Sequence, residues 1–113
     1  MIIIYHNPRC KKSRAGLQYL ETKQIEFTTR LYLKDMLTAE ELASLVKLLG
    51  IEAIELVRKQ EEYYKQELKG KTLGAEELIQ QMVANPKLIQ RPIVCDGSMA
   101  VLADPPENID DIL

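Results

Sequence analysis

The sequence contains few of the residues that mark secreted, metal-binding or membrane proteins. Its 113 residues include one histidine, no tryptophan and only two cysteines, Cys10 and Cys95. Two cysteines are too few for a secreted disulfide scaffold, so reduced thiols in the cytoplasm are expected. The apolar start at residues 1–5 is shorter than the ~7–15 residues of a signal-peptide core and the ~20 residues of a membrane span. We therefore expect a cytoplasmic protein that does not associate with a membrane.

Charge of one sign is also missing overall, but the charges are unevenly distributed. The formal net charge is −2, which argues against binding nucleic acid through overall basicity. Residues 1–30 nevertheless hold six Lys or Arg against two Glu, whereas no Lys or Arg follows Arg91. A short basic run is usually a solvated helix face. Here the basic run surrounds Cys10, which makes that cysteine a candidate for chemistry.

Hydrophobic periodicity predicts an alternation of strands and helices. Thr38 and Glu41 form a capping-box pattern at the start of one helix, and Asp96-Gly97 is a hairpin signal. Residues 61–68 are polar and predicted to lie on the surface. The predicted strands are residues 2–5, 25–33, 93–95 and 99–102, and the predicted helices are residues 11–23, 39–49, 51–57, 75–84 and 107–113.

The order of these elements predicts the fold class. It reads as a βαβ unit, a helical insert and a ββα unit, which is the α/β arrangement of a thioredoxin-like fold. The first helical crossover requires its two flanking strands to be parallel, whereas the later hairpin is antiparallel. We therefore predict a single domain over residues 1–113 with a mixed four-stranded sheet and a helical insert at about 38–90.

Reactive chemistry is concentrated in residues 6–14, between the first strand and the first helix. Ligands of open α/β sheets bind beyond the carboxyl ends of the strands, where this loop lies. Cys10 precedes the helix, whose free N–H groups favour a thiolate, and the neighbouring cations add to this effect. The same N–H groups can bind a tetrahedral oxyanion. The loop thus offers a nucleophile and an anion site together.

Three other uses of Cys10 fit the sequence poorly. Ser13 stands where a Cys-x-x-Cys motif would have its second thiol, so no resolving thiol lies nearby. A phosphatase-type loop needs arginine six residues after the cysteine, and Gly16 is there. Zinc needs about four ligands, and His6, Cys10 and Cys95 are too few. No metal is expected.

The loop His6-Asn7-Pro8-Arg9-Cys10-Lys11-Lys12-Ser13-Arg14 resembles the first βα turn of the glutaredoxin-coupled, ArsC-type arsenate reductases. The wider group includes Spx-like regulators of RNA polymerase. Two further segments match the family, Leu56-Val57-Arg58-Lys59 and Leu88-Ile89-Gln90-Arg91-Pro92-Ile93-Val94. The resemblance covers essentially the whole chain and implies a thioredoxin-like fold and a thiol-dependent reductase.

The resemblance also implies roles for residues of the loop. Cys10 would be the nucleophile that attacks arsenate at arsenic. His6 would lie near the thiolate and keep it ionised, Ser13 would hydrogen-bond the thiolate, and Arg14 would hold the loop. Glutathione would attack the resulting adduct and glutaredoxin would resolve the mixed disulfide, with no cofactor bound to the chain.

Three residues outside the loop complete the implied site. Arg58 and Arg91 would grip the oxyanion as bidentate forks. Pro92 would be the cis-proline that this fold places beside the active cysteine. Cys95 would then lie ~10 Å further along its strand. That exceeds the ~7 Å limit between the Cα atoms of a disulfide, so Cys95 is predicted to be structural.

One position departs from the family pattern. Arsenate reductases of this kind commonly carry a third arginine just before the proline that opens the last helix, and Asp104 stands there. An acid close to an oxyanion is repulsive. The alternative is therefore a thiol reductase for a different substrate, or a Spx-like regulator that binds RNA polymerase. A Spx switch normally uses Cys-x-x-Cys, which Ser13 interrupts.

Overall fold

A computed structural model describes residues 1–113, which form two compact units. The first unit combines Met1–Asp35 with Arg91–Leu113, and the second is Met36–Gln90. The second unit corresponds to the helical insert predicted at about 38–90. None of the helices has the length and apolar character needed to cross a membrane.

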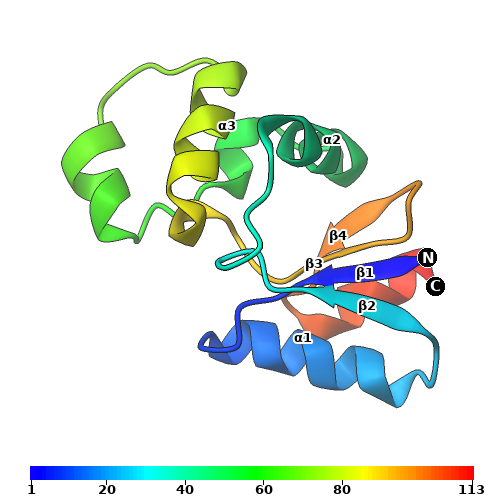
Figure 1. The fold of residues 1–113 in the computed structure, drawn as a ribbon. Coiled ribbons are helices and arrows are strands. Elements are labelled where there is room, and N and C mark those ends of the chain that lie inside the picture. The colour runs from blue at the N-terminus through cyan, green and yellow to red at the C-terminus, as the bar shows by residue number, and fades with distance from the viewer. The chain divides into compact units, whose positions relative to one another are not determined.

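A mixed four-stranded sheet forms the centre of the first unit (Figure 1). Its strands are β1 (Ile2–Tyr5), β2 (Phe27–Arg30), β3 (Ile93–Cys95) and β4 (Ala100–Leu102), in the order β2-β1-β3-β4. β1 pairs with β2 in parallel and with β3 antiparallel, and β4 pairs antiparallel with β3. The predicted α/β class and mixed sheet are confirmed. β2 is shorter than the predicted 25–33.

Helix α1 (Lys11–Thr22) and the 3₁₀ helix η4 (Pro106–Ile112) pack against this sheet. Their buried side chains join those of the central strands in one core, made of Ile4, Leu20, Val94, Ala103 and Ile109. The segment predicted as a helix over 107–113 is thus 3₁₀ rather than α. It is short and has one buried residue, Ile109, to anchor it, and short segments commonly adopt the tighter 3₁₀ form.

The second unit is helical, as predicted. It contains α2 (Ala39–Leu49), η1 (Ala53–Leu56), η2 (Tyr64–Leu68), α3 (Ala75–Ala84) and η3 (Pro86–Leu88). The capping box of Thr38 and Glu41 is present, and Gly50 ends α2 with a φ of 69° that suits glycine.

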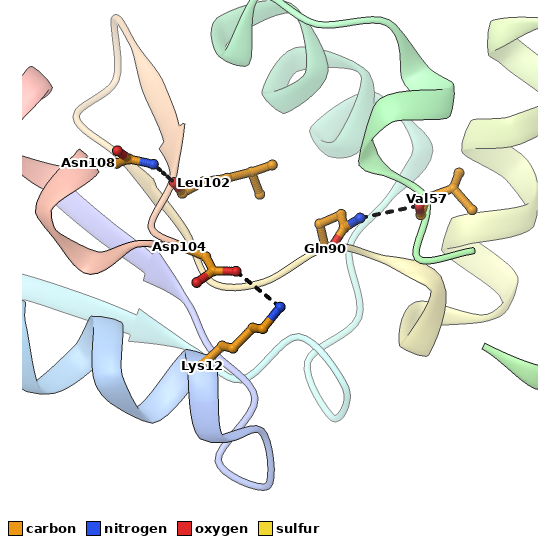
Figure 2. Close-up of polar contacts among 6 residues, drawn as sticks. All are labelled: Lys12, Val57, Gln90, Leu102, Asp104 and Asn108. Carbon is orange, nitrogen blue, oxygen red and sulfur yellow. Dashed lines mark hydrogen bonds and ion pairs between the residues drawn. The ribbon is translucent and has the colours of Figure 1, made fainter. Parts of the chain in front are cut away.

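One prediction within the second unit is corrected. The helix expected over 51–57 is only a 3₁₀ turn, because its last residue, Val57, is extended and forms a β-bridge with Ile89. Gln90 Nε2 also donates to the Val57 carbonyl at 3.3 Å (Figure 2). The polar stretch at 61–68 lies mostly on the surface, as predicted, and its part Tyr64–Leu68 forms a π-helical turn in which Leu68 is buried.

The strand register brings three loops of the first unit to one edge of the sheet. Tyr5, the last residue of β1, is opposite Ile93, the first residue of β3. Ile93 is in turn opposite Leu102, the last residue of β4. The residues that follow β1, precede β3 and follow β4 therefore meet at the carboxyl end of β1.

Candidate active site

Cys10 lies at the N-terminus of α1, as the sequence predicts. It is the N-cap residue, with extended backbone, and its carbonyl accepts the first helical hydrogen bond from the N–H of Arg14 at 3.0 Å. Its own N–H donates to the Asn7 carbonyl at 3.0 Å. The Asn7 side chain closes the same turn by accepting from the N–H of Arg9 at 3.0 Å. The turn aims the cysteine at the free N–H groups of the helix.

The Ser13 hydroxyl holds this loop from inside. The side chain is fully buried, and its Oγ accepts from the backbone N–H of Asn7 at 2.9 Å. The same Oγ is hydrogen-bonded to Nδ1 of His6 at 2.7 Å. Arg14 adds an outer tie, because its Nη1 donates to the Pro8 carbonyl at 2.9 Å. The loop-holding role implied for Arg14 matches this contact.

The environment of Cys10 favours the thiolate. Partial burial of the thiol opposes ionisation, but hydrogen bonding and charge from Arg91 and the backbone N–H groups of Ser13 and Lys12 outweigh it. Together they lower the pKa of Cys10 from its ordinary value. Ser13 contributes through its backbone N–H, because its hydroxyl is bonded to the His6 ring and the N–H of Asn7.

His6 is held inside the loop by its hydrogen bond to Ser13. Its side chain is buried, and burial, together with the charge of Arg14, lowers the pKa of His6. The lowered pKa favours the neutral form of the ring over the imidazolium. The role of the ring in the structure is to hold Ser13, and the backbone N–H of His6 also extends the sheet by donating to the Arg30 carbonyl at 2.9 Å.

Arg91 and Pro92 reach the site from the residues just before β3. The peptide bond between them is cis, the isomer that the family resemblance implies. The buried ring of Pro92 lies against Gly16 of α1: a β-carbon added to Gly16 would be 2.6 Å from Cγ of Pro92. This close contact aligns the start of β3 with the first turns of α1, where Cys10 and Arg91 face each other.

Asp104, the departure from the family pattern, lies at the rim of this site. Its Oδ2 forms an ion pair of 3.2 Å with Nζ of Lys12, in the first turn of α1 (Figure 2). The peptide bond between Asp104 and Pro105 is also cis, which the sequence analysis did not anticipate.

Arg58 belongs to the second unit. Its N–H donates to the Leu88 carbonyl at 2.7 Å, and its guanidinium pairs with the carboxylate of Glu61. Its contribution to oxyanion binding stays a prediction.

Cys95 is buried at the far end of β3 from Pro92, opposite Ile3 of β1. Its Sγ accepts from the N–H of Gly97 in the hairpin. The described residues contain no group of three or more His, Cys, Asp or Glu side chains placed to hold a metal ion.

Sequence reasoning assigned no role to Asn7 or to Gly16. Each of these residues nevertheless has a local signal in the sequence. Asn-Pro before a helix start is typical of a turn in which the Asn side chain bonds the following backbone. A glycine inside a helix costs stability unless something packs closely against it, and Pro92 does so here.

Comparison with known proteins identifies the group to which the chain belongs. A model of the ArsC family matches residues 5–112. The chain belongs to the ArsC family. An arsenate reductase of Haemophilus influenzae is 40% identical over 114 residues, covering 99% of this chain and 98% of that protein. An uncharacterized protein of Escherichia coli is 45% identical over 112 residues, covering 97% and 94%.

Solved structures agree with this assignment. An arsenate reductase from Vibrio cholerae has a TM-score of 0.94 and 39% identity to this ArsC-family chain, covering 99% of this chain and 97% of that one. The thioredoxin-like fold that the sequence predicted is thus shared with an ArsC-family structure over nearly the full length.

Proposed function

We propose that this ArsC-family chain is a thiol-dependent arsenate reductase. One observation carries the proposal: the Cys10 thiol faces the Arg91 guanidinium and the N–H groups of Lys12 and Ser13. A thiolate is the nucleophile, and a planar guanidinium with backbone N–H groups is the donor set that suits a tetrahedral oxyanion. The names of the similar proteins from Haemophilus influenzae and Vibrio cholerae support arsenate as the substrate.

The proposed first step is attack of the Cys10 thiolate on the arsenic of arsenate. The sulfur–arsenic bond forms while one arsenic–oxygen bond breaks, and that oxygen leaves as water after taking up protons. Arg91 and the N–H groups of the first turn hold the remaining oxygens and stabilise their charge. No metal is needed for this step.

The proposed second step transfers the electrons. Glutathione attacks the Cys10 sulfur, and arsenic leaves with the electron pair of the sulfur–arsenic bond as arsenite. Cys10 and glutathione are then joined by a disulfide, which glutaredoxin reduces to release the Cys10 thiolate. Two thiols are oxidised for each arsenic reduced from As(V) to As(III). Because these donors must be reduced, the proposed location is the cytoplasm.

The test is arsenite formation from arsenate with glutathione and glutaredoxin. The natural chain should produce arsenite, and Cys10→Ser should lose all activity above background because serine cannot form the adduct. Cys95→Ser is the matched control and should keep the activity, since Cys95 is buried at the opposite end of β3.

Arsenite production that survives Cys10→Ser would exclude the proposed mechanism. A natural chain that is folded and has a reactive Cys10 thiol but makes no arsenite would exclude arsenate as the substrate.

A second candidate is a reductase for a less charged substrate, which the Asp104 carboxylate beside Lys12 favours. A neutral mixed disulfide is such a substrate. If this candidate is correct, the chain reduces a neutral disulfide such as bis(2-hydroxyethyl) disulfide through Cys10, with glutathione as the reductant, while arsenate is left unchanged.

A further inference from the structure

Asp104 places a carboxylate next to the first turn of α1, whose N–H groups favour the Cys10 thiolate. Its Oδ2 lies 3.2 Å from Nζ of Lys12, and the two side chains are 46% and 63% exposed (Figure 2). The backbone N–H of the same Lys12 is one of the groups that favour the Cys10 thiolate. An anion that approaches Cys10 from solvent therefore meets Lys12 with its charge already balanced.

The backbone on both sides of Asp104 is held in place. Ala103, immediately before it, is fully buried, and its N–H donates to the Pro92 carbonyl at 2.9 Å. The side chain of Ala103 also lies against Gly16 of α1. Further along, Asn108 Nδ2 donates to the Leu102 carbonyl at 3.0 Å, which ties η4 back to β4 (Figure 2). These contacts fix the backbone from which the Asp104 side chain extends at the rim of the site.

The Lys12–Asp104 ion pair affects anionic reaction partners of Cys10 and not neutral ones. Arg91 faces the thiol directly and favours any anion there. Without Asp104, Lys12 would add a second positive charge at the rim and attract anions further. With Asp104 present, the Lys12–Asp104 pair has no net charge, and each additional negative charge on the incoming partner gains less. A neutral partner is unaffected.

We propose that Asp104 is a specificity-determining residue, which makes Cys10 favour the less negatively charged of two competing reaction partners. The inference rests on the proposed function only in taking the Cys10 thiolate as the reacting group. For a tetrahedral oxyanion, the proposed substrate class, Asp104 would reduce the preference of the site for the more highly charged protonation state over the less charged one.

The test compares two alkylating reagents that react with the same thiolate. Iodoacetate is an anion and iodoacetamide is neutral, so the ratio of their rates at Cys10 reports the charge seen by an incoming partner. The fraction of thiolate cancels from this ratio. Asp104→Asn should raise the ratio about two- to fivefold at low salt, the range of an exposed charge pair, and salt should reduce the difference. The modified cysteine is identified in the peptide that ends at Glu21.

Three further variants define the controls. Asp111→Asn removes the same charge from an exposed residue of η4. The neighbouring residue, Asp110, contacts Tyr19 and Lys23 near the C-terminal end of α1, so this part of η4 lies at the opposite end of the helix from Cys10. Asp111→Asn should leave the ratio unchanged. Lys12→Gln leaves Asp104 unbalanced and should lower the ratio. The combined Lys12→Gln and Asp104→Asn variant has no net charge at these two positions, like the natural ion pair, and should return to the natural ratio.

An unchanged ratio in Asp104→Asn, or an equal rise in Asp111→Asn, would overturn the proposal. A merely structural role for Asp104 would change both rates together and leave the ratio constant, which also overturns it. The arsenite assay separates this result from the proposed function: a chain without arsenate reduction can still show the shift in ratio, and an active reductase can lack it.

Discussion

Single residues determine how the loop presents its nucleophile. The Ser13 hydroxyl bonds both the Asn7 N–H and the His6 ring, so one buried side chain fixes the turn before Cys10. His6 acts through Ser13, and burial favours its neutral form, which leaves the positive charge near the thiol to Arg91. Thiolate stabilisation therefore comes from a guanidinium and backbone N–H groups, while the imidazole provides positioning.

Removing the Arg91 charge should raise the pKa of Cys10. In the natural chain the pH midpoint of Cys10 alkylation by iodoacetamide should lie below the free-thiol value of ~8.5. Arg91→Gln should shift that midpoint upward, because glutamine cannot supply the positive charge that favours the thiolate. The measurement is the rate of alkylation of Cys10 between pH 5 and 10.

Arg9→Gln is the matched control for this prediction. Arg9 is next to Cys10 in sequence and exposed, and it is not among the groups that lower the Cys10 pKa. Its substitution should move the midpoint less than Arg91→Gln does. Equal shifts in the two variants would mean that general positive charge, and not the Arg91 contact, activates the thiol.

At the scale of secondary structure, α1 is the element on which the site is assembled. Its first turn provides the N–H groups for Cys10, and its Ser13 ties back to the loop. One turn later, Gly16 lets Pro92 approach the helix, and with Pro92 comes Arg91. The helix therefore aligns the nucleophile with its anion-binding arginine through a contact that only glycine permits.

Gly16→Ala should destabilise the protein, although alanine is the better helix former by about 1 kcal/mol. The added methyl group would be 2.6 Å from the Pro92 ring, so the helix or the start of β3 must shift. Overpacking of this kind costs about 1–3 kcal/mol, and the shift should also reduce alkylation of Cys10 near neutral pH. Urea unfolding and the alkylation rate are the two measurements.

Gly74→Ala provides the comparison for this substitution. Gly74 precedes α3 with a negative φ, and an added β-carbon would make only ordinary contact with the Glu77 side chain. A loss below about 1 kcal/mol is expected, the cost of a poorer N-cap. If the Gly16 and Gly74 variants lose the same free energy of unfolding, the close contact with Pro92 does not cause the loss in Gly16→Ala.

At the scale of the whole molecule, the sheet decides which distant segments meet. β1 and β3 are its central strands, so residues 6–13 and 91–92 come to one edge although about eighty residues separate them. β4 then brings Asp104 to the same edge. The net charge of −2 thus combines a cationic loop at the site with an acidic remainder of the chain, of which Asp104 is brought to the loop.

Hydrogen exchange should reveal this organisation. The amides of Ile4 and Val94 lie in central strands with fully buried side chains and should exchange most slowly. Residues 69–72 are exposed and outside helices and strands, so their amides should exchange among the fastest. Exchange followed by NMR or mass spectrometry checks the order. Protection of residues 69–72 equal to that of Ile4 would contradict it.

The sequence could predict features that depend on local chemistry. The α2 boundaries followed from Thr38, Glu41 and Gly50, because caps act within a few residues. The hairpin at Asp96-Gly97 and the position of Cys10 at a helix start are local in the same sense. The sequence predicts η1 and η4 only as helices, because a few residues carry too little periodicity to separate the 3₁₀ form from the α form.

What the sequence by itself determined is the order of the elements, the reactive cysteine and the family of the chain. Only the tertiary structure decided which polar groups face one another. It assigned the Ser13 hydroxyl to His6 and Asn7, favoured the neutral form of His6, and placed the Asp104 carboxylate on Lys12. The physical reason is that hydrogen bonds, burial and charge pairs depend on distance in space, which sheet register and close packing set between residues far apart in the chain.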